Sequence, residues 1–204
     1  MEKKSKGKGG LFIVSAPSGA GKTTLCKRLV QKIGNIKPSV SFTTRQPRQG
    51  EIPDEDYSFV NETEFKAMVG GGDFVEWAVV HGNYYGTSGR KLEELMSAGY
   101  DVLLDIDTQG ARQIKNVFHN SVSVFILPPS MKELKLRLEG RMSNSVDDMN
   151  RRLQRAFEEI REYNLYDYVI VNDIIEDSLK KLEAVITAER LRSNKIDPHW
   201  IANI

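Results

Sequence analysis

Residues 15–24, SAPSGAGKTT, constrain this chain more than any other segment, and they directly follow the apolar run LFIV. Gly19 and Gly21 allow consecutive backbone N–H groups to turn toward phosphate oxygens without obstruction by a Cβ atom. The residues that follow have a helical pattern, and the positive N-terminus of a helix would face the same anion. The loop departs from the G-x-x-x-x-G-K-[ST] pattern at its first position, where Ala16 replaces glycine. Strand, loop and helix together predict a cradle for a nucleoside triphosphate.

Two side chains of this loop supply the chemistry that a bound triphosphate needs. Lys22 is expected to neutralise charge at the β/γ-phosphate bridge, and the Thr23 hydroxyl is expected to coordinate Mg²⁺. The residues expected to line the triphosphate are Ala16, Pro17, Ser18, Gly19, Ala20, Gly21, Lys22, Thr23 and Thr24.

The charge balance and the apolar content argue against several other classes of protein. The chain has 29 basic and 28 acidic residues, whereas a nucleic-acid binder usually carries a basic excess on one face. No apolar run approaches the roughly 18 residues that span a bilayer, and the basic segment 1–10 lacks the apolar stretch of a signal peptide. The single cysteine, Cys26, is expected to be a small buried hydrophobe in a reducing compartment. We therefore expect a cytoplasmic protein with a flexible tail over residues 1–10 and with neither a nucleic-acid nor a membrane partner.

Short apolar runs alternate with helical patterns along most of the chain. Strands are expected at 11–15, 101–107, 121–127 and 166–173, and their alternation with helices implies parallel pairing with right-handed crossovers. The predicted fold class is therefore α/β, a P-loop NTPase three-layer core with a parallel sheet, an inserted mixed α/β lobe and a short lid. The single domain 11–204 is expected to divide into core segments 11–37, 90–136 and 153–193, the lobe 38–89 and the lid 137–152.

Capping residues mark the starts of three expected helices. Asn61 is followed three residues later by Glu64, and Ser130 is followed by Glu133, which is the spacing of a capping box. Asp107 is expected to cap the helix TQGARQIK. The aromatic residues expected in the core of the inserted lobe are Phe59, Phe74 and Trp77.

A GTPase is an alternative because two strings resemble its guanine-nucleotide motifs. DTQG (107–110) follows an apolar strand, and NKID (194–197) lies near the end of the sequence. The second motif should follow a core strand, but here it follows the charged helix EAVITAERLRS. Only seven residues come after it, so the sequence favours another use of the triphosphate.

Several strings, in this order and at this spacing, resemble guanylate kinase in its bacterial single-domain form. The likeness covers nearly the whole chain after residue 10. The strings are SVSFTTRQPRQGE (39–51), DYSFV (56–60), FVEWAVVHGNYYGTS (74–88), LLDIDTQG (103–110), LEGR (138–141) and VIVND (169–173).

The resemblance implies transfer of the γ-phosphate of ATP to GMP, and to dGMP, giving ADP and GDP with Mg²⁺. Arg45 and Arg48 would grip the acceptor phosphate, which suits the guanidinium fork. Glu76 and Asp107 would accept hydrogen bonds from the N1–H and 2-amino groups that distinguish guanine from adenine, and Asp105 would help to hold Mg²⁺ through water. The full set of expected GMP-binding residues is Ser41, Arg45, Arg48, Tyr57, Glu76, Tyr85, Thr87, Asp105 and Asp107.

The same resemblance assigns arginines to a closing lid. Arg137, Arg141 and Arg152 would stabilise the transferred phosphoryl group and exclude water, and with Lys22 and Arg45 they complete the expected catalytic set. Asn172 resembles the residue that contacts the adenine of ATP. The lid departs from many relatives at Met142, where glycine is common.

Two other interpretations of the sequence remain. Some guanylate-kinase-like domains are protein-interaction scaffolds, but such domains are expected to lose the phosphate loop that this chain retains. A kinase for AMP, UMP or thymidylate would keep the loop, but VEWA (75–78) and NYYGTS (83–88) favour guanine. The sequence leaves a homo-oligomer open.

Overall fold

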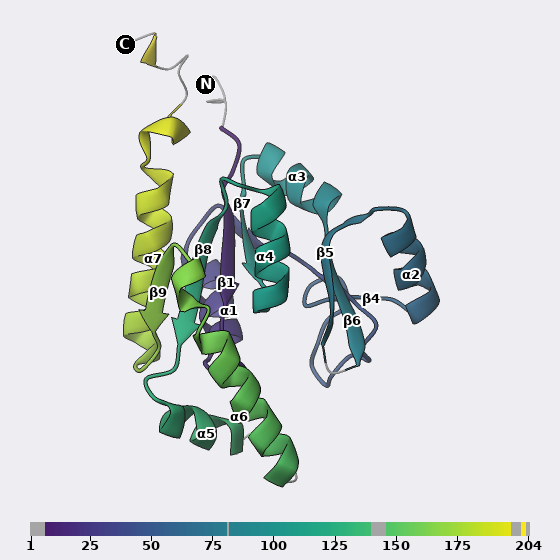
Figure 1. Cartoon of the computed structure of the whole chain (residues 1–204). Helices are drawn as coiled ribbons and strands as arrows, with labels where there is room; N and C mark the ends of the chain where they lie inside the picture. The colour runs from purple at the N-terminus through teal and green to yellow at the C-terminus, as the bar shows by residue number, and fades with distance from the viewer. Residues whose placement is uncertain (1–6, 81, 140–145, 197–200, 203–204) are drawn as a thin grey trace.

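A parallel five-stranded sheet forms the centre of the computed structural model, which describes residues 7–80, 82–139, 146–196 and 201–202. The strand order is β2-β7-β1-β8-β9, and each neighbouring pair is parallel. Figure 1 labels β7, β1, β8 and β9 of this sheet. The strands are β1 (Leu11–Ser15), β2 (Ile36–Pro38), β7 (Asp101–Asp105), β8 (Val122–Leu127) and β9 (Tyr168–Val171). The strands of the predicted core are therefore confirmed, and β2 adds one that the sequence analysis did not specify.

Helices cover both faces of this sheet and complete a three-layer core. Successive side chains of a strand point to opposite faces, so the apolar β1 supplies a core on each side. Phe12 and Val14 pack with α1 (Lys22–Lys32) and α7 (Ile175–Arg190). Leu11 and Ile13 pack with α3 (Gly89–Ser97) and α4 (Thr108–Val117). The resulting α/β architecture is the one that the alternating pattern predicted.

A second sheet, of order β4-β3-β6-β5, forms a lobe beside the core (Figure 1). Its strands are β3 (Phe42–Thr43), β4 (Ser58–Phe59), β5 (Phe74–Val80) and β6 (Asn83–Ser88), and α2 (Glu62–Gly70) packs on it. The α2 side chain Phe65 is fully buried and stacks on Phe74, with ring centroids 4.6 Å apart. Trp77 was expected in this core but is 40% exposed. The alternation of β5 turns Glu76 and Ala78 inward and Trp77 outward.

Two helices below the sheet in Figure 1 lie near the phosphate loop. They are α5 (Met131–Glu139) and α6 (Val146–Ile160), which share a small apolar cluster of Leu134, Leu138 and Ala156. Two short 3₁₀ turns, Tyr163–Leu165 and Ser193–Lys195, complete the described elements. The three predicted caps are confirmed, because Asn61, Asp107 and Ser130 accept hydrogen bonds from the backbone N–H groups of Glu64, Gly110 and Glu133.

The end of the expected N-terminal tail is attached to the core. Gly9 donates its N–H to the Met96 carbonyl over 2.9 Å, and Gly10 donates to Asp101 Oδ1 over 2.6 Å. Gly9 and Gly10, at the end of the expected tail 1–10, therefore lie against the core, whereas residues 1–6 lie outside the described residues. Among the described helices, none has the length and apolar character that crossing a membrane requires.

Candidate active site

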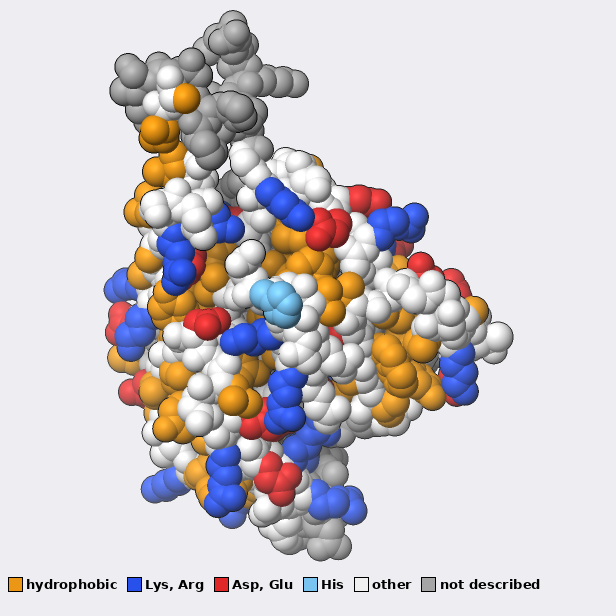
Figure 2. All heavy atoms as spheres, turned by 45° about the horizontal axis from the view of Figure 1, so that its top comes forward, with side chains coloured by type: hydrophobic (Ala, Val, Ile, Leu, Met, Phe, Trp, Pro, Cys, Tyr) orange, Lys and Arg blue, Asp and Glu red, His pale blue; other side chains and the backbone are white. Residues whose placement is uncertain are grey.

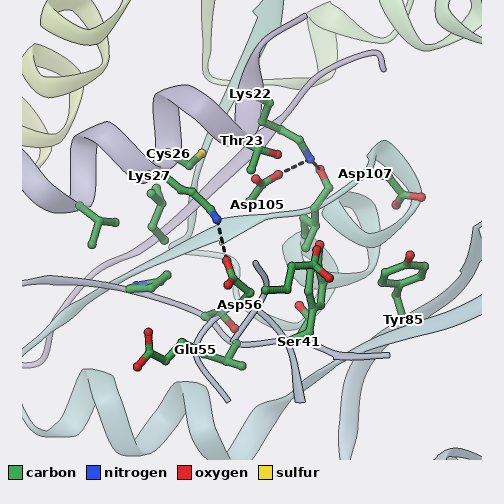
Figure 3. A pocket seen from close by; sticks show the side chains of 18 of the residues that line it. Lys22, Thr23, Cys26, Lys27, Ser41, Glu55, Asp56, Tyr85, Asp105 and Asp107 are labelled. Carbon is green, nitrogen blue, oxygen red and sulfur yellow. Dashed lines mark hydrogen bonds and ion pairs between the residues drawn. The ribbon is translucent and has the colours of Figure 1, made fainter. Parts of the chain in front are cut away.

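A cavity of about 960 Å³ lies between the core and the lobe. The phosphate-loop end of α1 and the segment after β7 form its core side, and the lobe forms the other side (Figure 3). Parallel sheets commonly bind ligands at the carboxyl ends of their strands, which is where β1 and β7 end here. The predicted site residues that line the cavity are Ser18, Lys22, Thr23, Ser41, Arg45, Arg48, Tyr57, Glu76, Tyr85, Asp105 and Asp107.

The phosphate loop has the backbone that its glycines were expected to allow. Gly19 and Gly21 both have φ of 90°, which is the left-handed region that glycine tolerates best. Gly21 also occupies the N-cap of α1 and brings no capping side chain, so the first turn directs its N–H groups at the loop. A Cβ at Gly19 would lie 3.0 Å from the Leu138 side chain, so α5 packs directly on the loop.

Lys22 is fixed at the core side of the cavity. Its Nζ lies 2.6 Å from the Ile106 carbonyl oxygen and 2.6 Å from Asp105 Oδ1. Burial lowers the pKa of Lys22, but the charge and hydrogen bond of Asp105 outweigh it, so the pKa is raised above its ordinary value. The ammonium group is therefore held charged where the loop would present a phosphate.

Thr23 and Asp105 point into the same part of the cavity (Figure 3). A hydroxyl and a carboxylate are hard oxygen donors, which suits a divalent cation that takes its other ligands from phosphates and water. The described residues contain no group of three or more His, Cys, Asp and Glu side chains arranged to hold a metal on their own. The donor set therefore fits a metal that arrives with a nucleotide.

Arg45 is held in place by a partner that the sequence analysis missed. Its Nη2 lies 2.8 Å from Glu51 Oε1, and its Nη1 lies 3.0 Å from Glu51 Oε2, so the pair is bidentate. The guanidinium also lies 5.2 Å from the Tyr57 ring centroid. The hydrogen bond from Arg45 lowers the pKa of Glu51, and Glu51 also accepts the Arg48 N–H over 2.7 Å. Glu51 ends the string TTRQPRQGE, but nothing local in that string indicates the pairing.

Glu76 and Thr87 form a buried polar pair at the lobe side of the cavity. The Thr87 hydroxyl donates to Glu76 Oε1 over 2.5 Å, and Glu76 is 5% exposed. Burial raises the pKa of Glu76 to about 7, although the Thr87 hydrogen bond opposes this shift, and the charge of Asp107 raises it further. Two carboxyl groups therefore lie close together, and Asp107 Oδ2 is buried without a hydrogen-bond partner.

The arginines expected in the lid contact different parts of the core. Arg152 donates from Nη2 to the Ser18 hydroxyl over 3.2 Å, so α6 reaches the phosphate loop. Arg137 donates to the Asn172 carbonyl over 3.2 Å and pairs with Glu133. Arg141 and Met142 lie outside the described residues.

Asn172, expected near adenine, is 4% exposed and contacts the phosphate loop instead of open solvent. Its side-chain amide donates to the Ala20 carbonyl over 2.7 Å, and a Cβ at Gly21 would lie 2.5 Å from Asn172 Nδ2. Asn172 therefore supports the loop, which the sequence did not reveal.

The second GTPase-like string lies at the wrong end of the sheet. Asn194 and Lys195 line a separate cavity together with Leu11, Asp101 and Val122, which begin β1, β7 or β8. The phosphate loop follows the opposite end of β1. The fold and this site together define a P-loop nucleotide-binding protein with an additional lobe facing the loop.

Comparisons with known proteins identify the family within that class. The family model for guanylate kinase matches residues 8–189. The guanylate kinases of Geobacter metallireducens and Geobacter sulfurreducens are 52% and 51% identical over 191 residues, covering 94% of each chain. The crystal structure of guanylate kinase from Anaplasma phagocytophilum superposes with a TM-score of 0.77 at 36% identity, covering 92% of this chain and 89% of that one. This chain belongs to the guanylate kinase family, whose members are kinases that need a divalent metal with ATP.

Proposed function

We propose that this protein transfers the γ-phosphate of ATP to GMP, and to dGMP, yielding ADP and GDP. The observation that carries the proposal is the buried Glu76 carboxyl group, which accepts the Thr87 hydroxyl and lines the same cavity as Ser18, Lys22 and Thr23 of the phosphate loop. One end of the cavity has acceptors for a base, and the other end has Lys22 and the loop for phosphates. A second nucleotide is therefore the acceptor that fits, rather than water or a protein hydroxyl.

Guanine suits the polar end because it presents donors where adenine does not. The guanine N1–H and 2-amino groups would donate to the carboxylates of Glu76 and Asp107, with Ser41 and Thr87 adding hydroxyls. Adenine has an acceptor at N1 and no 2-amino group, so it would leave the buried carboxylates unpaired. An unpaired buried group costs about 1–3 kcal/mol, and more when it is charged. This cost would discriminate against AMP.

The phosphate end must bring two anions together. Arg45 and Arg48, with the Tyr57 and Tyr85 hydroxyls, would bind the phosphate of GMP, and the pairing with Glu51 presets the Arg45 fork. Lys22 and the arginines of α5 and α6 would offset the charge of the triphosphate. Mg²⁺, held by Thr23 and by Asp105 through water, would supply charge neutralisation and orientation of the ATP phosphates.

The chain needs no general base for this reaction. The acceptor phosphate is already an anionic nucleophile, so catalysis consists of positioning and electrostatic stabilisation. Arg152 reaches Ser18 from α6, and this contact would help to cover the loop and exclude water. We place the enzyme in the cytoplasm, where the thiol of the buried Cys26 would stay reduced.

The test is product analysis. Incubation with ATP, GMP and Mg²⁺ should yield ADP and GDP in equal amounts, and chelation of the metal should stop both. Formation of ADP with inorganic phosphate and without GDP would overturn the proposal, because the phosphoryl group would then have gone to water.

A further inference from the structure

Helix α6 carries two arginines that face different parts of the site. Arg152 Nη2 lies 3.2 Å from the Ser18 hydroxyl of the phosphate loop. Arg155 Nη2 lies 4.0 Å from Asp107 Oδ2. Side chains three residues apart lie on the same face of a helix. One face of α6 therefore contacts the loop for the donor nucleotide and brings a guanidinium within ion-pair distance of the carboxylate expected to bind the acceptor base.

The two carboxylate oxygens of Asp107 differ in their hydrogen bonding. Its Oδ1 accepts the Gly110 N–H over 2.8 Å as the cap of α4, whereas its Oδ2 is buried without a hydrogen bond. A buried carboxylate oxygen is costly unless something pairs with it. The guanidinium of Arg155 is the charge that approaches this oxygen from α6.

Arg155 is itself oriented by its own helix. Its Nε donates to Glu159 Oε1 over 3.1 Å, an i,i+4 pair, and the Glu159 side chain is 14% exposed. This contact fixes the Nε edge of the guanidinium and directs Nη2 toward Asp107. The charged groups around Asp107 therefore include Arg155 and Glu159 on α6, Glu76 on β5 and Lys22 on α1.

We propose that Arg155 is a positioning residue for guanine recognition, which orients the Asp107 carboxylate toward the acceptor base. This inference rests on the proposed transfer to GMP. Because Arg152 and Arg155 share α6, the seating of this helix on the phosphate loop and the orientation of Asp107 are mechanically linked. Binding at the two ends of the cavity should therefore be coupled, and such coupling is reciprocal.

Steady-state kinetics of Arg155→Gln test the positioning role. We expect the KM for GMP to rise about tenfold, with kcat changed by less than about threefold and a smaller rise in the KM for ATP, because the coupling is reciprocal. Arg155→Lys keeps the charge and should recover part of the loss. Arg161→Gln is the matched control, because it removes a positive charge just beyond α6 from a residue that stacks on Phe157, 4.6 Å from its ring centroid. An unchanged KM for GMP in Arg155→Gln, or equal increases for both substrates, would overturn the proposal.

A double-mutant cycle shows whether Arg155 acts through Asp107. In an Asp107→Asn background, Arg155→Gln should raise the KM for GMP by less than about twofold further, because its partner is already altered. Full additivity of the two effects would contradict a route through Asp107.

Calorimetric titration tests the coupling between the two ends of the cavity. The wild type should bind GMP more tightly with ADP present than without it, and Arg155→Gln should reduce this increase in affinity. An equal increase in both proteins would contradict the coupling through Arg155. If the wild type itself formed no GDP, the proposed function would fail. If the wild type formed GDP but Arg155→Gln had no effect, only this inference would fail.

Discussion

A Cβ atom at Gly110 would lie 2.8 Å from Glu76 Oε2 and 3.5 Å from Asp107 Oδ1. The carboxylate of the lobe residue therefore rests directly on the backbone of the core helix α4. One turn along this helix, the Gln113 amide donates to the Trp77 carbonyl over 3.1 Å and accepts the Trp77 N–H over 3.3 Å. Together these contacts attach β5 to α4 and place both carboxylates at one end of the cavity.

Replacement of Gly110 by alanine should displace the Glu76 carboxylate without unfolding α4. We expect the KM for GMP to rise about tenfold with the KM for ATP little changed, because a contact of 2.8 Å requires a shift. Alanine favours a helix over glycine by about 1 kcal/mol, so thermal unfolding should not report a loss of the fold. Gly70→Ala is the control, since nothing lies within 4 Å of its Cβ position. Equal kinetic constants for the two variants would show that the Glu76 carboxylate does not depend on its close contact with the Gly110 backbone.

The buried Glu76 should make stability depend on pH. Its pKa is about 7 in the folded chain, against an ordinary value of 4.5. Between these values the folded state holds a proton that the unfolded state has released. The free energy of unfolding should therefore fall as pH rises from about 4.5 through 7, by on the order of 3 kcal/mol.

Chemical denaturation of the wild type and Glu76→Gln across pH 5 to 8 measures this dependence. The uncharged glutamine should flatten the slope and be the more stable of the two at pH 8, while it weakens the binding of GMP. A slope that is the same in both proteins would show that Glu76 does not titrate in this range.

Lys22→Ala should reduce kcat by about 10³-fold or more, since the ammonium would offset charge that develops on the transferred phosphoryl group. Asp105 and Ile106, whose oxygens bind Lys22, both line the cavity, so these oxygens could bind water when the lysine is removed. The fold should therefore remain intact. Lys32→Ala removes a lysine at the far end of the same helix, where it pairs with Glu183, and should leave kcat near the wild-type value. Near-normal turnover in Lys22→Ala would break the assigned mechanism.

Glu51→Gln tests whether the Arg45 fork is preset. Loss of the bidentate ion pair should let the Arg45 side chain sample other rotamers, so the KM for GMP should rise about fivefold to tenfold with the KM for ATP unchanged. Glu55→Gln is the control, because Glu55 also lines the cavity but, among the described residues, makes no ion pair with Arg45. A Glu51→Gln enzyme that binds GMP as tightly as the wild type would show that Arg45 needs no such support.

Local patterns predicted much of this structure because they act within a few residues. The phosphate loop, the strand and helix alternation, and the caps at Asn61, Asp107 and Ser130 each depend on neighbours in the sequence. The exposure of Trp77 was predicted wrongly, since composition alone does not reveal which face of β5 is covered.

Contacts made by tertiary folding could not be predicted in this way. Glu51 is six residues from Arg45, and Asp107, the cap of α4, is 48 residues from Arg155, so no periodicity connects the members of either pair. The buried position of Asn172 under the loop depends on how β9 ends beside β8. The family resemblance supplied residue roles, whereas the structure supplies the partners that hold those residues in place.

The most direct test of the account is acceptor choice by the wild type. ADP formation from ATP with Mg²⁺ would be measured with GMP, AMP, UMP, dTMP or no acceptor, at equal concentrations. We expect strong stimulation by GMP and rates near the no-acceptor background for the other three. Comparable stimulation by AMP, UMP or dTMP would contradict the reading of guanine by Glu76 and Asp107, and ADP formation independent of any acceptor would contradict phosphoryl transfer to a nucleotide.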